Sequence, residues 1–180
     1  KLGAFVQGTY GGVENKWELD NTDIRMADHA DLNGNHLVYG VSTNNSPSVS
    51  DLWNTTPVWG FPWASSDLAP TPSAGPLIDS LGGQVIGATG YMMWKNLLYI
   101  EAGGYTMLPK NAQKGVGTFD SEQNRINGCA PYWRAALQHN WNGQYGSIGA
   151  YGLQANVNPQ RLQGVGTDNY YDYGFDATYQ

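Results

Sequence analysis

The sequence predicts an all-β fold, an antiparallel up-and-down meander of about eight strands. Two observations predict it. The composition is rich in aromatic residues (13%) and in glycine (24 residues) but poor in charged residues (13%). This mixture favours short strands and turns over helices. Apolar and polar residues also alternate with a period of two along most of the chain, as they do on a β-strand with two different faces.

Eight segments show this alternation clearly enough to be read as strands. Several have the roughly 9–11 residues that a tilted strand needs to cross a bilayer, whereas strands of soluble proteins have about five or six. The predicted strands are residues 2–10, 19–29, 36–43, 84–94, 97–107, 130–141, 145–157 and 170–179.

The alternation assigns one apolar and one polar face to the sheet. In the last strand, Tyr171, Tyr173 and Phe175 alternate with Asp172 and Asp176. In the same way, Trp133 and Leu137 oppose Arg134, and Leu98 and Ile100 oppose Tyr99 and Glu101. A soluble sandwich would bury the apolar face against a second sheet, so the alternation alone leaves both a lipid-facing and a core-facing sheet open.

The connections between the predicted strands favour the membrane alternative. Three tight links, "LNGN" (32–35), "WKN" (94–96) and "WNGQ" (141–144), fall at one end of the meander, and two carry the Asn-Gly turn signal. At the other end "GGVENK" is short, but the links at 44–83, 108–129 and 158–169 are long. Short turns at one end and long loops at the other are typical of bacterial outer-membrane β-barrels.

The composition argues against several classes of function. Lys plus Arg number 9 against 15 for Asp plus Glu, a net charge of −6, so we expect no nucleic-acid partner. The single cysteine, Cys129, excludes a disulfide framework, a Cys-rich zinc site and a C-x-x-C-H haem attachment within this chain. The three histidines, His29, His36 and His139, lie on different strands without ligand spacing, so we expect no metal site. No local catalytic motif is present, and we do not expect an enzyme.

Four runs of the sequence resemble a family of proteobacterial outer-membrane, porin-like β-barrel proteins. The runs are "KLGAFVQGTY", a run that begins "LDNTDIRMADHADLNGNHLVYG", "WRAALQHNWNGQYGSIGAYGLQANV" and "DNYYDYGFDATYQ". The second run continues through the long Asn/Trp/Pro stretch to residue 79. Members of the family often carry a c-type haem segment before the barrel and are often labelled as cytochromes. The resemblance implies an outer-membrane location, a lipid environment and a c-type cytochrome as a partner.

The resemblance covers nearly the whole chain, but the haem motif and the later strands of the family are absent. We therefore interpret residues 1–180 as a single β-barrel domain, an internal part of a larger barrel and incomplete at both ends. The chain itself is expected to hold no cofactor, and a haem c would belong to a preceding segment.

Two sets of residues are candidates for function. The charged residues of the polar face would line the lumen and tune ion passage, and we expect Glu101 and Arg134, on neighbouring strands, to contact each other or a shared third charge; the set is Asp23, Arg25, Glu101, Arg134, Asp172 and Asp176. The second set lies in the long loop 44–83, which we expect on the extracellular side. There, aromatic side chains among prolines would form a constriction or plug, or else a self-packed lid: Trp53, Trp59, Phe61 and Trp63.

Two functions of different classes follow. The first is an outer-membrane barrel that acts as a porin or as a sheath for an electron carrier. The second is a soluble secreted module that binds carbohydrate or another flat ligand through its loop tryptophans. The outward residues distinguish them, because a membrane barrel exposes them and a soluble sandwich buries them: Leu98, Ile100, Trp133, Leu137, Tyr171, Tyr173 and Phe175.

Overall fold

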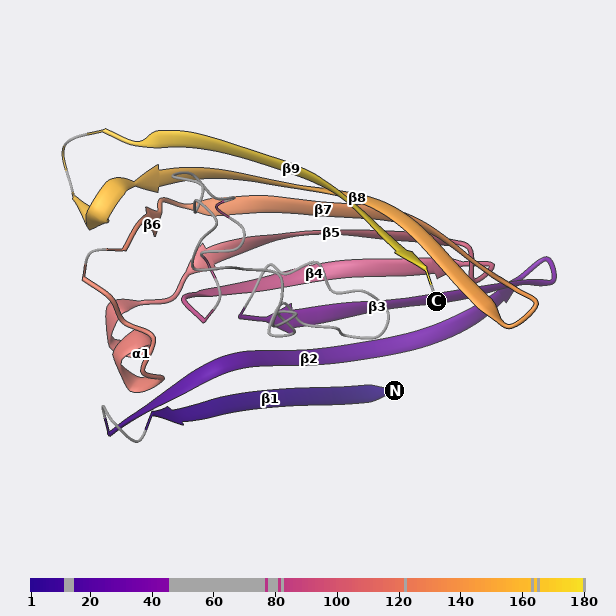
Figure 1. The fold of residues 1–180 in the computed structure, drawn as a ribbon, viewed down its shortest axis with the longest axis horizontal. Helices are drawn as coiled ribbons and strands as arrows, with labels where there is room; N and C mark the ends of the chain where they lie inside the picture. Colours follow the sequence, from indigo (N-terminus) through magenta and orange to yellow (C-terminus); the bar gives the residue numbers. More distant parts are fainter. Residues whose placement is uncertain are drawn as a thin grey trace, which may run out of the picture.

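A computed structural model describes residues 1–11, 15–45, 77, 81, 83–121, 123–162, 164 and 166–179 of the chain. Nearly all regular structure is strand (Figure 1). The elements, in chain order, are β1 (Leu2–Gly11), β2 (Lys16–Leu32), β3 (Asn35–Asn44), β4 (Val85–Trp94), β5 (Leu98–Met107), α1 (Lys110–Gly115), β6 (Arg125–Ile126), β7 (Cys129–Trp141), β8 (Gln144–Asn158), a short 3-10 turn η2 (Pro159–Arg161) and β9 (Asp168–Tyr179).

The strands form one antiparallel up-and-down sheet, as the sequence predicts. Each of the eight long strands pairs with its neighbour in the chain, with β5 followed by β7, and the two-residue β6 pairs with the end of β8. All eight predicted segments are confirmed as strands, and β2 is longer than expected. The described sheet does not close on itself: β1 and β9 are its two edges.

The three predicted tight links are turns at one end of the sheet, which we call the turn end. Two of them are two-residue turns with positive φ at both positions, Asn33-Gly34 and Asn142-Gly143, and Lys95 and Asn96 adopt positive φ in the third. This backbone twist matches the twist of the flanking strands, and Asn and Gly adopt it at low steric cost. The opposite end, the loop end, carries α1, β6 and η2 (Figure 1).

The two faces of the sheet differ in chemistry. The inner face carries Glu101 and Arg134, which are 4% and 3% exposed, while the outer face carries Ile100 and Trp133, which are 37% and 42% exposed. Alternation is strict along the last strand, whose burial switches at every residue from Tyr170 to Tyr179. The sheet therefore buries its polar face and exposes its apolar one.

A small apolar core covers the inner face near the loop end. Leu77 and Leu81, which precede β4, pack there with residues of β4, β5, β6, β7 and β8, namely Val85, Tyr105, Ile126, Ala130, Tyr132, Leu153, Ala155 and Val157. Apolar burial thus fixes one end of the inner face. The middle of that face is left to polar side chains.

Glycines opposite tyrosines let rings lie flat on the inner face. Gly87 pairs directly with Tyr105, and a Cβ at Gly87 would overlap the Tyr105 ring. The pairs Gly40 with Tyr91 and Gly174 with Tyr151 repeat the arrangement on β3–β4 and β8–β9. An aromatic ring over a cross-strand glycine replaces the packing that glycine lacks, so these pairs help to fix the strand register.

Candidate functional site

The six charged residues predicted for the lumen all lie on the inner face. Asp23 and Arg25 come from β2, Glu101 from β5 and Arg134 from β7. Asp172 and Asp176, on β9, occupy inner positions of intermediate exposure. The face of each residue agrees with the alternation in the sequence, because a strand turns alternate side chains to opposite faces.

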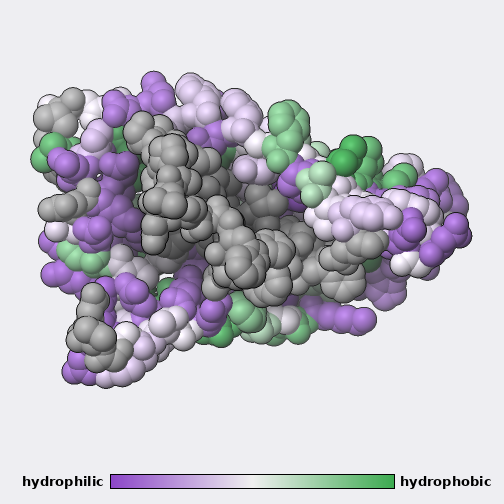
Figure 2. All heavy atoms as spheres, in the orientation of Figure 1, coloured by the Kyte–Doolittle hydropathy of each residue, from purple (hydrophilic) through white to green (hydrophobic). Residues whose placement is uncertain are grey.

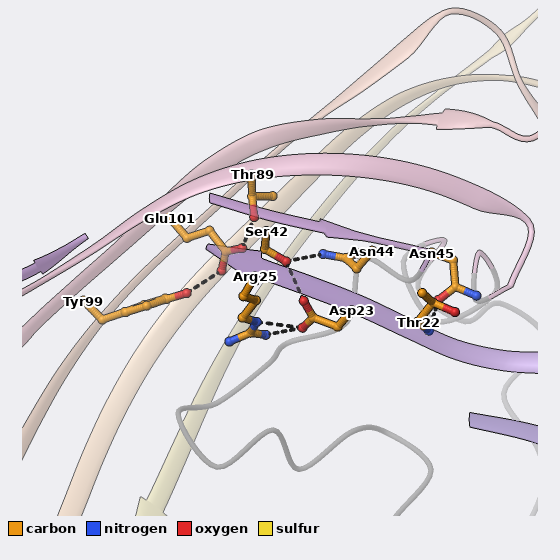
Figure 3. Close-up of polar contacts among 9 residues, drawn as sticks. All are labelled: Thr22, Asp23, Arg25, Ser42, Asn44, Asn45, Thr89, Tyr99 and Glu101. Carbon is orange, nitrogen blue, oxygen red and sulfur yellow. Dashed lines mark hydrogen bonds and ion pairs between the residues drawn. The ribbon is translucent and has the colours of Figure 1, made fainter. Parts of the chain in front are cut away.

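The Asp23 carboxylate is held by two strands. Arg25 forms an ion pair with it, with 2.6 Å between Nη2 and Oδ2, and the Ser42 hydroxyl on β3 donates to its other oxygen at 2.8 Å (Figure 3). The Ser42 oxygen in turn accepts from the Asn44 side-chain amide at 3.2 Å. Asp23 and Ser42 are 7% and 1% exposed, so these bonds replace the water that the carboxylate has lost.

The Glu101 carboxylate accepts two hydroxyl hydrogen bonds. The donors are Thr89 Oγ1 on β4 at 2.5 Å and the Tyr99 hydroxyl at 2.8 Å (Figure 3). The Tyr99 ring stacks against that of Tyr91, with 6.2 Å between centroids, and the Arg25 guanidinium lies 6.0 Å from the Tyr91 centroid. Two tyrosine rings therefore connect the surroundings of Asp23 and Glu101 into one polar network.

Arg134 forms a bidentate ion pair with Asp176. Its Nη1 and Nη2 lie 2.7 and 2.8 Å from the two carboxylate oxygens, although β8 separates the two strands. The intervening residue is Gly149, where a Cβ would lie 2.8 Å from Asp176 Oδ2 and 3.2 Å from Arg134 Nη2. The absence of a side chain at Gly149 gives the ion pair its space.

The expectation that Glu101 and Arg134 contact each other or a shared third charge is not met by any ion pair among the described residues. The two residues are direct cross-strand neighbours, as predicted. Among the described residues, however, the ion pair within 4 Å that Arg134 forms is with Asp176, and Glu101 is bonded to Thr89 and Tyr99. The Glu101 carboxylate, opposite Arg134, thus accepts its hydrogen bonds from neutral donors. The Arg134 guanidinium forms its bidentate pair with Asp176 instead.

Sequence reasoning missed the neutral donors of this network. Ser42 and Thr89 attract no attention as isolated residues, because neither belongs to a motif. The signal that could have found them is register: Arg25 pairs with Ser42, Ser42 with Thr89, and Glu101 lies on the next strand. Hydroxyls at inner positions of β3 and β4 face the charges on either side.

The outer face exposes the apolar residues that the membrane hypothesis requires. Six of the seven outward residues named from the sequence are exposed, from 37% for Ile100 to 88% for Phe175, and Leu98 is half-buried. Figure 2 shows hydrophobic side chains at the surface along both long sides of the view. Outward positions of β1, β3, β4, β5, β7, β8 and β9 carry no Asp, Glu, Lys or Arg, and β2 places Asp28 outward.

Aromatic residues gather at the turn end. Trp94 and Trp141 each end a strand at a tight turn, and the Trp141 ring lies 6.2 Å from that of Tyr179. Lys95 places its ammonium 4.7 Å from the Trp94 ring, and His139 stacks on Trp141 at 5.9 Å. Rings with polar neighbours are characteristic of a boundary between an apolar and an aqueous environment.

The other predicted site lies outside the described residues. Trp53, Trp59, Phe61 and Trp63 belong to the connection between β3 and β4, which is the longest between consecutive strands. In the part of the chain that the structure describes, no three His, Cys, Asp or Glu side chains are grouped to hold a metal ion. No helix there is long and apolar enough to span a membrane.

No protein-family model, curated protein or solved structure matches this chain. Function is therefore inferred from the chemistry of the two faces.

Proposed function

We propose that the chain forms the wall of a β-barrel in the bacterial outer membrane, serving as a porin or as a sheath for an electron carrier. One observation carries the proposal: the sheet exposes an apolar, almost uncharged outer face and buries a charged inner face. A soluble protein has the opposite arrangement, whereas lipid outside and water or cargo inside require this one.

The strand lengths fit a bilayer. The shortest of the eight long strands have 10 residues. At about 3.4 Å per residue and a tilt of about 40°, such a strand rises about 26 Å, close to the roughly 25 Å apolar band of outer-membrane barrels. The proposed orientation puts the turn end in the periplasm, because barrels of this class have their short turns there.

The two edges belong to the proposal as well. Lipid offers no hydrogen bonds to the free backbone groups of β1 and β9, so in a membrane both edges must pair with further strands. We propose that such strands complete the barrel, that the loop tryptophans form a constriction, plug or lid, and that a c-type cytochrome is the cargo of a sheath. The proposal includes no catalytic residue.

The substitution Phe175→Arg tests the outer face. Phe175 lies in the middle of β9 and is 88% exposed, so an arginine there would meet hydrocarbon in a membrane and water in a soluble protein. In phospholipid vesicles we expect the free energy of unfolding to fall by about 2–4 kcal/mol, measured by urea titration of tryptophan fluorescence. The matched control is Thr178→Arg on the inner side of the same strand, which should cost less.

Equal costs for the two variants would contradict the membrane proposal, as would a wild-type chain that stays monodisperse without detergent. The second outcome would favour the soluble carbohydrate-binding module. That alternative needs a second layer over the outer face, and the exposure of Trp133, Tyr173 and Phe175 speaks against one among the described residues.

A further inference from the structure

Four cationic side chains gather at the loop end of this acidic chain. Lys110 and Lys114 lie on α1, Arg125 on β6 and Arg161 in η2. They are four of the nine Lys and Arg residues of a protein with a net charge of −6. We call them the loop-end cluster.

Three of the four charges surround one aromatic ring. The distances to the Phe119 ring centroid are 5.1 Å from Lys110 Nζ, 5.3 Å from Lys114 Nζ and 5.0 Å from Arg161 Cζ. Any two of these charges therefore lie within about 10 Å of each other, about one Debye length at 0.1 M ionic strength. The cations are close enough to repel one another and to act on one ligand.

The described residues do not neutralise this cluster by ion pairing. None of the four cations has a described carboxylate oxygen within 4 Å. Arg161 instead donates to the Asp120 carbonyl oxygen at 2.9 Å and to Gln113 Oε1 at 2.7 Å. Partial burial and the nearby Arg125 charge lower the pKa of Arg161, and the Asp120 charge opposes them. An added anion would relieve the repulsion.

The cluster has a built support. Gln113 is fully buried, and its amide donates to the carbonyl oxygens of Gln84 and Leu108 while its oxygen accepts from Arg161. Gln160 and Arg161 both adopt positive φ, 47° and 57°, a conformation that non-glycine residues rarely take and that marks a position fixed by its surroundings. The Arg161 guanidinium is held in place by these contacts.

The segment that carries the two lysines crosses the loop end of the sheet. It leaves the end of β5, and the Leu19 amide on β2 donates to the Val116 carbonyl at 2.9 Å. Because β3 and β4 lie between β2 and β5, this segment crosses the loop end, and Figure 1 shows α1 there between the ends of β2 and β6. The cluster therefore lies at the loop end, which would be the mouth of the proposed barrel.

We propose that the loop-end cluster binds a soluble phosphate-bearing anion. Guanidinium and ammonium groups are the side chains that bind phosphate, Arg through two parallel hydrogen bonds and Lys as a point charge. Three cations within about 10 Å of one another suit an anion that carries more than one negative charge. The position at the mouth favours a ligand from solution over a phospholipid headgroup. The preference for a ligand from solution rests on the proposed membrane orientation, whereas the anion site itself does not.

Isothermal titration calorimetry with inorganic pyrophosphate tests the site on the full chain in nonionic detergent at low ionic strength. We expect saturable binding that weakens as salt is added. The double substitution Lys110→Gln with Lys114→Gln should weaken binding at least about tenfold, because it removes two charge-assisted contacts. Both lysines are exposed, so the fold should persist, and Lys110→Arg with Lys114→Arg should restore binding.

The matched control is Lys95→Gln, because Lys95 makes the same kind of contact with Trp94 but lies at the turn end and outside the loop-end cluster. It should leave pyrophosphate binding unchanged. Absence of saturable binding, or equal loss in the control and the double variant, would overturn the proposal. Flotation with phosphatidylglycerol vesicles is the second experiment. If the chain binds these vesicles through Lys110 and Lys114 but does not bind pyrophosphate, the ligand is a lipid headgroup, and the proposal of a soluble anion is overturned.

Discussion

At the scale of single residues, the inner face shows how charges remain in a buried position. The Arg134 side chain is 4% exposed, and moving a guanidinium out of water costs several kcal/mol unless a partner compensates. Asp176 supplies both oxygens, and Gly149 leaves the space for them. The pair contributes its stability as a unit, because either member alone would be a desolvated charge.

The substitution Asp176→Asn should therefore destabilise the protein more than the loss of one hydrogen bond. We expect a loss of about 2–5 kcal/mol, since Arg134 keeps its charge and loses its counterion. The measurement is the urea dependence of tryptophan fluorescence in detergent or lipid. Asp31→Asn is the control, because Asp31 is 74% exposed and 3.4 Å from His36, and it should change stability by less than about 0.5 kcal/mol. Similar losses in both variants would show that the Arg134 pair has no special role.

At the scale of elements, the strands were predictable and the short elements were not. Each long strand has ten or more residues, a length over which a period of two gives a strong signal. The two residues of β6 and the six of α1 are too few to show any period. The face of each residue followed from alternation. The partner of Arg134 did not, because it depends on Gly149 in β8 and lies two strands away, and alternation within one strand carries no information about that distance.

The cross-strand glycine pairs give a prediction at this scale. Gly87→Ala should destabilise the sheet by about 1–3 kcal/mol, because the new methyl group would overlap the Tyr105 ring in a buried, well-packed position. Gly90→Ala, on the outer face of the same strand, has its nearest neighbour at 4.0 Å and should be nearly neutral. Thermal unfolding of both variants in one detergent makes the comparison. A Gly90 variant that is as unstable as the Gly87 variant would mean that β4 rejects any side chain, and the ring packing would not be the cause.

At the scale of the whole molecule, the polar face of the sheet is buried and the apolar face is exposed, the reverse of the usual arrangement in a soluble protein. The polar network is buried, apolar side chains face outward, aromatic rings mark the turn end, and a cationic cluster lies at the loop end. Composition predicted part of this arrangement through its low charge. The cationic cluster could not be predicted, because its members are separated by up to 51 positions in the sequence and three of them meet around Phe119 through tertiary contacts.

The six predicted inner charges also set an expected ion preference. Four are carboxylates (Asp23, Glu101, Asp172 and Asp176) and two are guanidiniums (Arg25 and Arg134), a balance of −2 that should favour cations in a water-filled barrel. In planar bilayers under a potassium chloride gradient, we expect a reversal potential of the sign given by cation selectivity. Asp172→Asn should move that potential toward zero, because it removes one inner charge. Asp28→Asn, on the outer face of β2, should leave it unchanged, since that carboxylate does not face the lumen. A wild-type preference for anions, or an equal effect of both variants, would show that the inner charges do not line the conducting path.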